Sequence, residues 1–137
     1  MKQLASLFAL LLIVVGYGVS LAAITQTSTT VFGKVIMRAN LIPAAVGTGN
    51  GEWIDTSGMS AMTIHITGII TATVEVDASN ESTRPSDATH GYKLNATDIT
   101  TNQIFSVTVP VRWLKARVTA YTSGTINGYL EAQVGGN

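Results

Sequence analysis

Acidic side chains gather in the middle of the sequence at a spacing that suits acid–base chemistry or cation binding. Glu75 and Asp77 are two residues apart in a stretch that alternates like a strand, so both lie on one face. Paired carboxylates can exchange protons with a substrate, or bind Ca²⁺, which takes about six to eight oxygen ligands. Asn80, Glu81 and Asp87 in the next loop supply further oxygens. A solvated polar face is the simpler interpretation. We therefore predict no metal and no cofactor, and keep these five residues as calcium candidates.

The chain offers little for nucleophilic catalysis. It has no cysteine, which removes thiol chemistry, Cys-bound metals and disulfides. Its two histidines are His65, on the polar face of a predicted strand, and His90, in a predicted loop. Neither has neighbours in the sequence that indicate a catalytic triad, and we interpret both as surface histidines. We predict no catalytic residue and a protein that is not an enzyme.

One predicted strand, over residues 112–121, carries a mixed aromatic and basic stripe. The stripe consists of Trp113, Lys115, Arg117 and Tyr121. Exposed aromatic residues beside arginine are typical of protein interfaces, and aromatic rings on a sheet also bind sugars. The competing interpretation is a second core face, with the two basic heads reaching its margin. We name the four residues as interface candidates, and both interpretations stay open.

Strands must position these side chains, because the sequence after residue 30 alternates with a period of two rather than 3.6. The runs 59–67 and 70–79 flank Gly68, which predicts a hairpin, and Ser123-Gly124 predicts another turn. Further strands are expected over residues 31–38, 104–109, 112–121 and 126–134. This pattern of short strands and Gly, Asn and Ser turns predicts an all-β fold. We expect an antiparallel β-sandwich of immunoglobulin-like or jelly-roll topology.

The composition of the chain limits the kinds of molecule that it is expected to bind. The 137 residues fit one domain, and the 8 basic residues only balance the 8 acidic ones, so the basic excess of nucleic-acid binders is missing. Charged residues make up 12% of the chain, about half the usual share. Such a weakly repulsive surface suits packing against other copies. We expect a homo-oligomer that contacts other structural proteins and no nucleic acid.

Residues 4–24 form an uncharged, mostly apolar run behind Lys2. A signal peptide fits, because Ser20 and Ala22 are small residues before a possible cut ahead of Ala23. A membrane-spanning helix also fits, because about 20 apolar residues cross a bilayer. A retained helix buried in an assembly or its lipid layer is the third possibility. Each of these makes the protein exported or membrane-associated.

The run also fixes the expected domain organisation. We expect a hydrophobic helical leader over residues 1–24, a polar linker over 25–30 and a β-sandwich domain over 31–137. If the leader is retained, its apolar side chains would contact the membrane or assembly. These side chains are Leu7, Phe8, Leu11, Leu12 and Val15.

Three blocks of the sequence together resemble small β-sandwich modules of phage virion proteins. They are residues 53–67, Gly68 with 71–80, and 109–125. The resemblance covers residues 52–134, and such modules occur in head-decoration, tail and receptor-binding proteins of tailed phages. It implies a sandwich with a structural or attachment role and no enzymatic activity. Two features depart from that family: the export leader, and the missing aromatic residue after Asn80.

These observations predict a non-enzymatic structural or surface protein of a virion or similar assembly. It would act by self-association and attachment, on the virion surface if viral. The alternative is a secreted or membrane-tethered bacterial module that binds a glycan or a protein. A hydrolase built on Glu75 and Asp77 is the least favoured interpretation.

Overall fold

The computed structural model describes residues 26–31 and 34–134, which form one antiparallel sheet and contain no helix. The main strand order is β1-β2-β8-β5-β6; β3 and β4 also pair with β8, and β7 with β5. The strands are β1 Gln26–Val31, β2 Lys34–Ala45, β3 Gly49–Asn50, β4 Ile54–Asp55, β5 Met59–Ser79, β6 Tyr92–Lys93, β7 Gln103–Val107 and β8 Trp113–Val134. The prediction of an all-β antiparallel fold is confirmed.

The predicted leader, residues 1–24, lies outside the described residues, together with the helix and the five contact side chains expected there. Within residues 26–31 and 34–134, no helix is long and apolar enough to cross a membrane. The predicted polar linker is partly a strand, because residues 26–30 lie in β1 and pair with β2 in antiparallel register.

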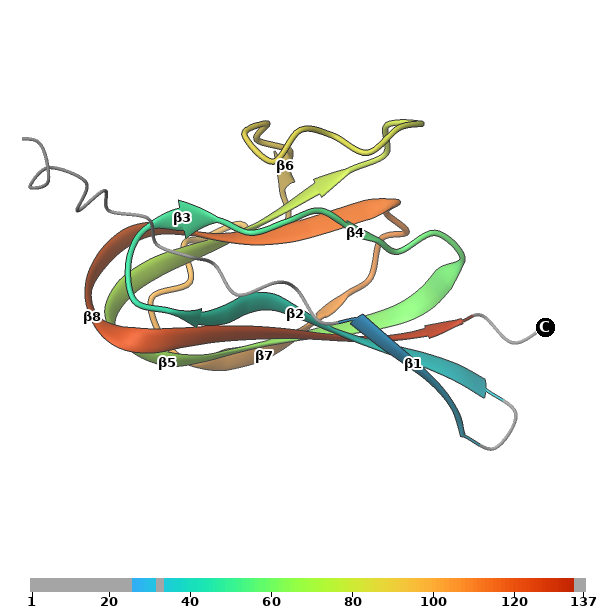
Figure 1. Ribbon diagram of the computed structural model, residues 1–137, viewed down its shortest axis with the longest axis horizontal. Coiled ribbons are helices and arrows are strands. Elements are labelled where there is room, and N and C mark those ends of the chain that lie inside the picture. Colours follow the sequence, from blue (N-terminus) through green and yellow to red (C-terminus); the bar gives the residue numbers. More distant parts are fainter. Residues whose placement is uncertain (1–25, 32–33, 135–137) are drawn as a thin grey trace, which may run out of the picture.

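Two long strands dominate the fold. β5 has 21 residues and β8 has 22, and they pair with each other from end to end. This ribbon curls over at its middle, so that the two halves of the sheet face each other (Figure 1). We call one half the first layer; it holds β1, β2, β7 and residues 59–67 and 126–134. The second layer holds β3, β4, β6 and residues 69–79 and 113–124.

Two glycines allow the ribbon to bend. Gly68 and Gly124 have φ angles of 80° and 125°, in the region that favours glycine. A Cβ on Gly68 would lie 1.8 Å from the carbonyl oxygen of Thr125, and one on Gly124 would lie 2.4 Å from that of Gly68. The pairing register also shifts between Thr67 and Ile69, which adds local bending. The two backbones therefore cross too closely for any side chain.

The bend corrects two expectations. The hairpin predicted at Gly68 and the turn predicted at Ser123-Gly124 are both wrong, because each pair of runs is one continuous strand. A glycine with positive φ can bend a strand as well as reverse it. Here each half-strand finds its partner in the other long strand rather than in its own continuation.

Apolar side chains from both layers meet between the two halves of the sheet. Ile64 and Ile66 from the first layer and Val74 and Val76 from the second are 0% exposed. Leu130 of β8 joins them at 1%. The inward faces predicted for residues 62–66 and 72–76 are therefore confirmed. This shared core leaves each layer one outer face for other uses.

Candidate functional site

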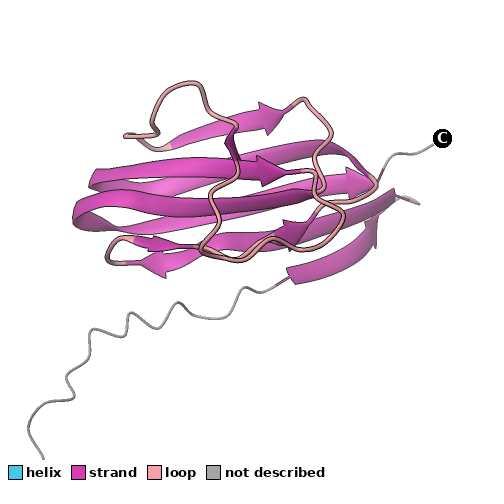
Figure 2. Cartoon of the chain, turned by 90° about the horizontal axis from the view of Figure 1, so that it is seen from above, coloured by secondary structure: helices cyan, strands magenta, loops and turns pink. Residues whose placement is uncertain are grey.

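A loop covers the outer face of the second layer. Residues 80–91 lie above this layer in Figure 1, and Figure 2 looks down on the same side, where loop segments cross over the strands. Beneath the loop lie Trp53, Trp113 and Lys115, which are 4%, 8% and 0% exposed. The expectation of an exposed stripe is thus corrected at Trp113 and Lys115.

These three long side chains hold the loop by its backbone. The Nε1 of Trp113 donates to the carbonyl of Glu81, and the Nε1 of Trp53 donates to that of Ser86, both at 3.0 Å. We call Trp53, Trp113, Lys115 and the loop 80–91 the covered cluster. An indole N–H that is buried needs an acceptor, and the loop supplies one to each ring.

Lys115 is the unusual member of the covered cluster. Its Nζ donates to the carbonyl of Asp87 at 2.9 Å and to the carbonyl of Thr89. It also lies 4.7 Å from the centre of the Trp53 ring, within cation–π range. Burial lowers the pKa of the Lys115 ammonium, because the charged form loses its water. Carbonyl dipoles and an aromatic face replace that water.

Cations neutralise the paired carboxylates. Arg117 donates to Glu75 through Nη2 and to Asp77 through Nε, the latter at 3.1 Å. Lys93 adds a contact to Glu75 at 3.3 Å and another to Asp98. The Lys93–Asp98 hydrogen bond raises the pKa of Lys93 and lowers the pKa of Asp98. Glu75 and Asp77 do share a face, as predicted, and basic side chains already occupy it.

Asp77 is the most deeply buried carboxylate of this group. Its side chain is 1% exposed, and its Oδ1 has no hydrogen-bond partner among the residues that the structure describes. Cross-strand register places it opposite Lys115, which turns its own Nζ to the loop carbonyls. Asp77 therefore contributes negative charge beside the covered cluster without making a direct bond to Lys115.

Asn80 and Asp87 have structural partners through their side chains, and Glu81 has one through its backbone carbonyl. Asn80 accepts a hydrogen bond from the backbone N–H of Arg112 at 2.8 Å. Asp87 accepts one from Arg84 at 2.7 Å, and the carbonyl of Glu81 is taken by Trp113. In residues 26–31 and 34–134, no group of three or more His, Asp or Glu side chains is placed to hold a metal ion.

The last two stripe residues are half-buried and also have partners within the chain. Arg117 faces the two acids, and the hydroxyl of Tyr121 donates to the carbonyl of Gly124 at 2.8 Å, which braces the bend. Each of the four stripe residues thus makes a polar contact within its own chain. Their role as an interface stays a prediction.

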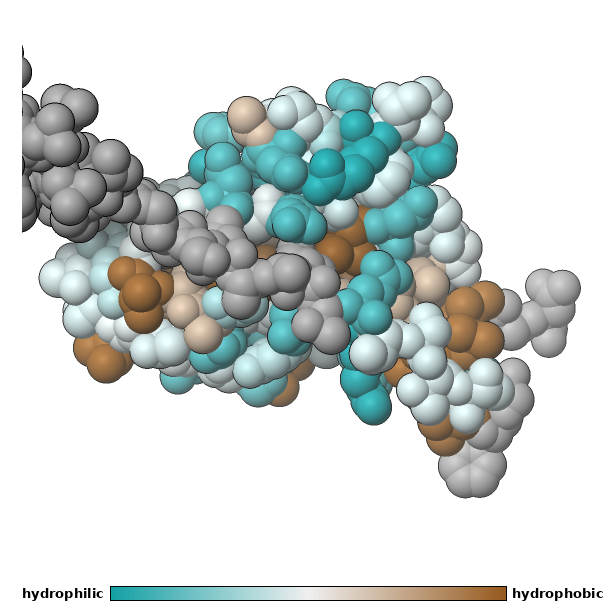
Figure 3. Space-filling model, in the orientation of Figure 1, coloured by the Kyte–Doolittle hydropathy of each residue, from teal (hydrophilic) through white to brown (hydrophobic). Residues whose placement is uncertain are grey.

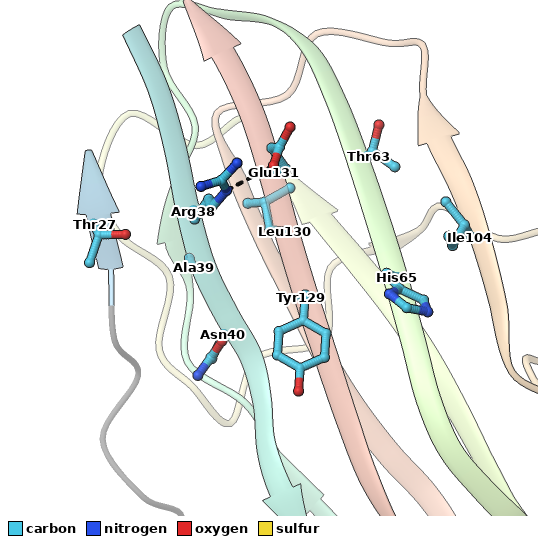
Figure 4. Close-up of a pocket in the computed structure, with 10 residues that line it drawn as sticks. All are labelled: Thr27, Arg38, Ala39, Asn40, Thr63, His65, Ile104, Tyr129, Leu130 and Glu131. Atoms are coloured by element: carbon cyan, nitrogen blue, oxygen red, sulfur yellow. Dashed lines mark hydrogen bonds and ion pairs between the residues drawn. The ribbon is translucent and has the colours of Figure 1, made fainter. Parts of the chain in front are cut away.

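The outer face of the first layer is open and hollowed. A groove of about 520 Å³ crosses its strands (Figure 4). Cross-strand register aligns Asn40 of β2, Tyr129 of β8, His65 of β5 and Ile104 of β7 in one row. Tyr129 is 43% exposed and Ile104 is 63% exposed. The groove therefore has an aromatic and aliphatic floor open to solvent.

Polar groups border this floor without leaving a net charge. Arg38 and Glu131 pair across β2 and β8, with 2.8 Å between Nε and Oε2 (Figure 4). Thr27 and Thr63 add hydroxyl groups. The rings of His65 and Tyr129 are 6.1 Å apart and tilted by 45°, so they do not stack face to face. Such a groove suits a neutral ligand that has both apolar and hydroxyl-bearing faces.

Reasoning from the sequence missed this groove. His65 was interpreted as a surface histidine, and Tyr129, Ile104 and Asn40 were not selected at all. Alternation does place His65 outward, but only the register across four strands brings the row together. The local signal was Tyr129 itself, at a position that alternates with the apolar Leu130 and Ile126 in the last predicted strand.

Two regions of the surface differ in hydropathy. In Figure 3 the side that carries the loop 80–91 is largely hydrophilic, whereas apolar residues appear at the end of the β1–β2 hairpin. The apolar residues there include Val31 and Val35, which are 40% and 38% exposed.

The described chain is an all-β protein built on a single folded-over antiparallel sheet. No protein-family model matches its sequence, and no curated protein matches it significantly. Its fold is similar to that in the crystal structure of the SPBc2 prophage-derived protein YomS. The two share 14% sequence identity over 82% of this chain and 96% of that chain, with a TM-score of 0.52. At this identity the likeness concerns the fold, and it supports a phage-related one.

Proposed function

We propose that this chain is a non-enzymatic structural protein of a phage particle or a similar surface assembly, acting by self-association and attachment. The observation that carries the proposal is the folded-over sheet shared with a prophage-derived protein. In this proposal the two layers form a β-sandwich of the phage virion type, to which three sequence blocks are similar. In this proposal the apolar run over residues 4–24 directs the protein out of the cytoplasm or into a membrane.

The polar side chains of the described chain support a structural role. The carboxylates suited to acid–base work are neutralised by Arg117 and Lys93, and the buried Lys115 holds a loop by its carbonyls. Side chains committed to one another in this way rigidify a fold and are poorly placed to exchange protons with a substrate. Rigidity suits a protein whose task is to hold surfaces in place.

The test is co-purification with particles. Particles are isolated from the producing culture by density gradient, and the chain is quantified by mass spectrometry against the major capsid protein. We expect a fixed copy number in the particle band. A chain found only in the cell envelope or the medium would contradict the proposal. Intact mass from the same sample reports the leader, because loss of residues 1–22 contradicts a membrane anchor.

The groove favours a second candidate function, an exported or membrane-tethered module that binds glycans. Tyr129 offers a ring face, Asn40 and Thr63 offer neutral hydrogen-bonding groups, and the Arg38–Glu131 pair can donate and accept. Sugar rings present an apolar face and a rim of hydroxyl groups, which this arrangement matches.

A glycan array with the purified chain tests the second function. We expect binding that Tyr129→Ala abolishes and that Tyr92→Ala leaves unchanged, because Tyr92 is an exposed tyrosine at 78% outside the groove. Binding that survives Tyr129→Ala, or no binding to any neutral glycan, would count against it.

A further inference from the structure

The sheet ends at β1 with an edge that no other described strand covers. β1 is the first strand of the sheet order and, among the described strands, pairs only with β2. All six of its residues are exposed. An edge strand presents unpaired backbone N–H and C=O groups, which can pair with a strand from another chain.

Within its own six residues, β1 lacks the sequence features that usually prevent such pairing. Natural edge strands are blocked by lysine, proline, bulges or very short length. The sequence of β1, QTSTTV, holds no charge and no proline, and its register with β2 is regular over all six pairs. The other edge strands are shorter: β3, β4 and β6 have two residues each, and β7 has five.

We propose that two copies of this chain pair antiparallel through β1, so that the first layers join into one continuous sheet across a twofold axis. The inference rests on the proposed function, because it names the surface through which self-association occurs. Main-chain hydrogen bonds supply the attraction, as in other cases of strand addition. A twofold contact needs a surface that complements itself.

The sequence of β1 meets that requirement. An axis at Ser28 places Ser28 opposite Ser28 of the second copy, Thr27 opposite Thr29, and Gln26 opposite Thr30. Thr–Thr and Thr–Ser pairs across strands stabilise a sheet, whereas like charges directly opposite destabilise it. Both faces of the joint therefore carry hydroxyl pairs, and no charge opposes another copy.

Pairing through β1 would also set the relative positions of the grooves of the two copies. Thr27 lines the groove and lies in β1, so pairing would place one groove on each side of the axis. Two linked sites that bind the same kind of ligand gain avidity without any new contact to it.

Disulfide trapping tests the proposal directly, because the chain has no cysteine of its own. The full-length Ser28→Cys chain is expressed, oxidised mildly and run on a non-reducing gel. We expect a covalent dimer at several times the yield of either control chain, Thr71→Cys or Thr122→Cys. The control residues are exposed and lie in β5 and β8, away from β1.

A charge variant gives an independent readout. S28K/T29K places lysine opposite lysine at the axis, while both positions are exposed within one chain and tolerate the change. We expect the native mass to fall to that of a monomer, with an unchanged far-UV circular dichroism spectrum.

The outcomes separate this inference from the proposed function. If the native chain is oligomeric but trapping is no better than in the control chains, pairing through β1 is wrong and self-association uses another surface. A native chain that is monomeric in the particle and in solution contradicts both.

Discussion

The two outer faces of this folded-over sheet differ sharply, although one pair of strands runs through both layers. The second layer carries long side chains outward, and a loop buries Trp53, Trp113 and Lys115. The first layer carries Tyr129, His65 and the exposed Arg38–Glu131 pair outward, and its face stays open as a groove. Long side chains occur on both faces, so the difference lies in the loop 80–91, whose carbonyls accept hydrogen bonds from the long side chains of the second layer. The comparison predicts that the covered face contributes more to stability than the open one.

The largest expected effect comes from breaking the bend that both layers share. Gly68→Ala places a Cβ 1.8 Å from the carbonyl oxygen of Thr125, so the two strands must separate. We expect a loss of about 4 kcal/mol in the free energy of unfolding, at the high end for one substitution. Urea denaturation measures it.

Gly58→Ala is the matched control for that substitution. Gly58 also has a positive φ, 76°, but an added Cβ would meet nothing within 4 Å. Only the backbone cost of about 1–2 kcal/mol is expected. Equal losses in the two variants would show that the close crossing of the strands does not matter.

The next prediction compares the loss of stability on removing Lys115, which lies under the loop, with the loss on removing Arg38, which lies on the open face. Lys115→Ala removes a fully buried side chain and leaves the carbonyls of Asp87 and Thr89 without their donor. We expect a loss of about 3 kcal/mol, because unpaired buried polar groups are costly. Lys115→Met keeps most of the volume and isolates the part due to the donor.

Arg38→Ala is the counterpart in the first layer. Its ion pair with Glu131 has both side chains well exposed, at 63% and 46%, so we expect less than about 0.5 kcal/mol. Thermal denaturation of Lys115→Ala and Arg38→Ala, measured in parallel, compares the two losses of stability. Similar losses would contradict the expectation that the covered face contributes more to stability than the open one.

A smaller effect concerns the indole of the stripe. Trp113→Phe keeps the ring buried but loses the hydrogen bond to the carbonyl of Glu81, for a cost of about 1 kcal/mol. Amide exchange of residues 80–91 should become faster in this variant. Tyr129→Phe on the open face should change neither quantity, because its side chain is already exposed at 43%.

The smallest effect depends on pH. A hydrogen bond from the Ser57 side chain lowers the pKa of Asp55 below its ordinary 3.8. The folded state therefore favours the carboxylate, so its contribution is complete above pH 3.8 and is lost as the pH falls through the folded value. Asp55→Asn should cost a few tenths of a kcal/mol at pH 7. The difference from wild type should shrink in urea titrations towards pH 3, and a constant difference would contradict this assignment.

Much of the fold could be predicted from local alternation. The inward faces of residues 62–66 and 72–76 follow from apolar residues at every second position, and the structure buries them. The bend could not be predicted, because a glycine permits a turn and a bend equally. β1 could not be predicted because Gln, Thr and Ser at five consecutive positions, followed only by Val31, show no apolar face.

The candidate site was less accessible to such reasoning. Glu75 and Asp77 were correctly placed on one face, but their partner Arg117 is 42 and 40 residues away in the sequence. The stripe at Trp113 and Lys115 was recognised, yet its cover is held by backbone carbonyls, which every residue type offers. The groove depends on register across four strands, which no single stretch of sequence encodes.

The position of β8 has a consequence for how the chain folds. β8 is the last strand described, and β2, β3, β4 and β5 all pair with it. Those strands have no other route into one sheet until residues 113–134 have been synthesised. Because pairing between distant residues is slow, we expect folding to be late, post-translational and limited by closure of the β5–β8 ribbon. A chain cut short before β8 would keep the β1–β2, β5–β6 and β5–β7 pairs but would have no strand to join β2 to β5.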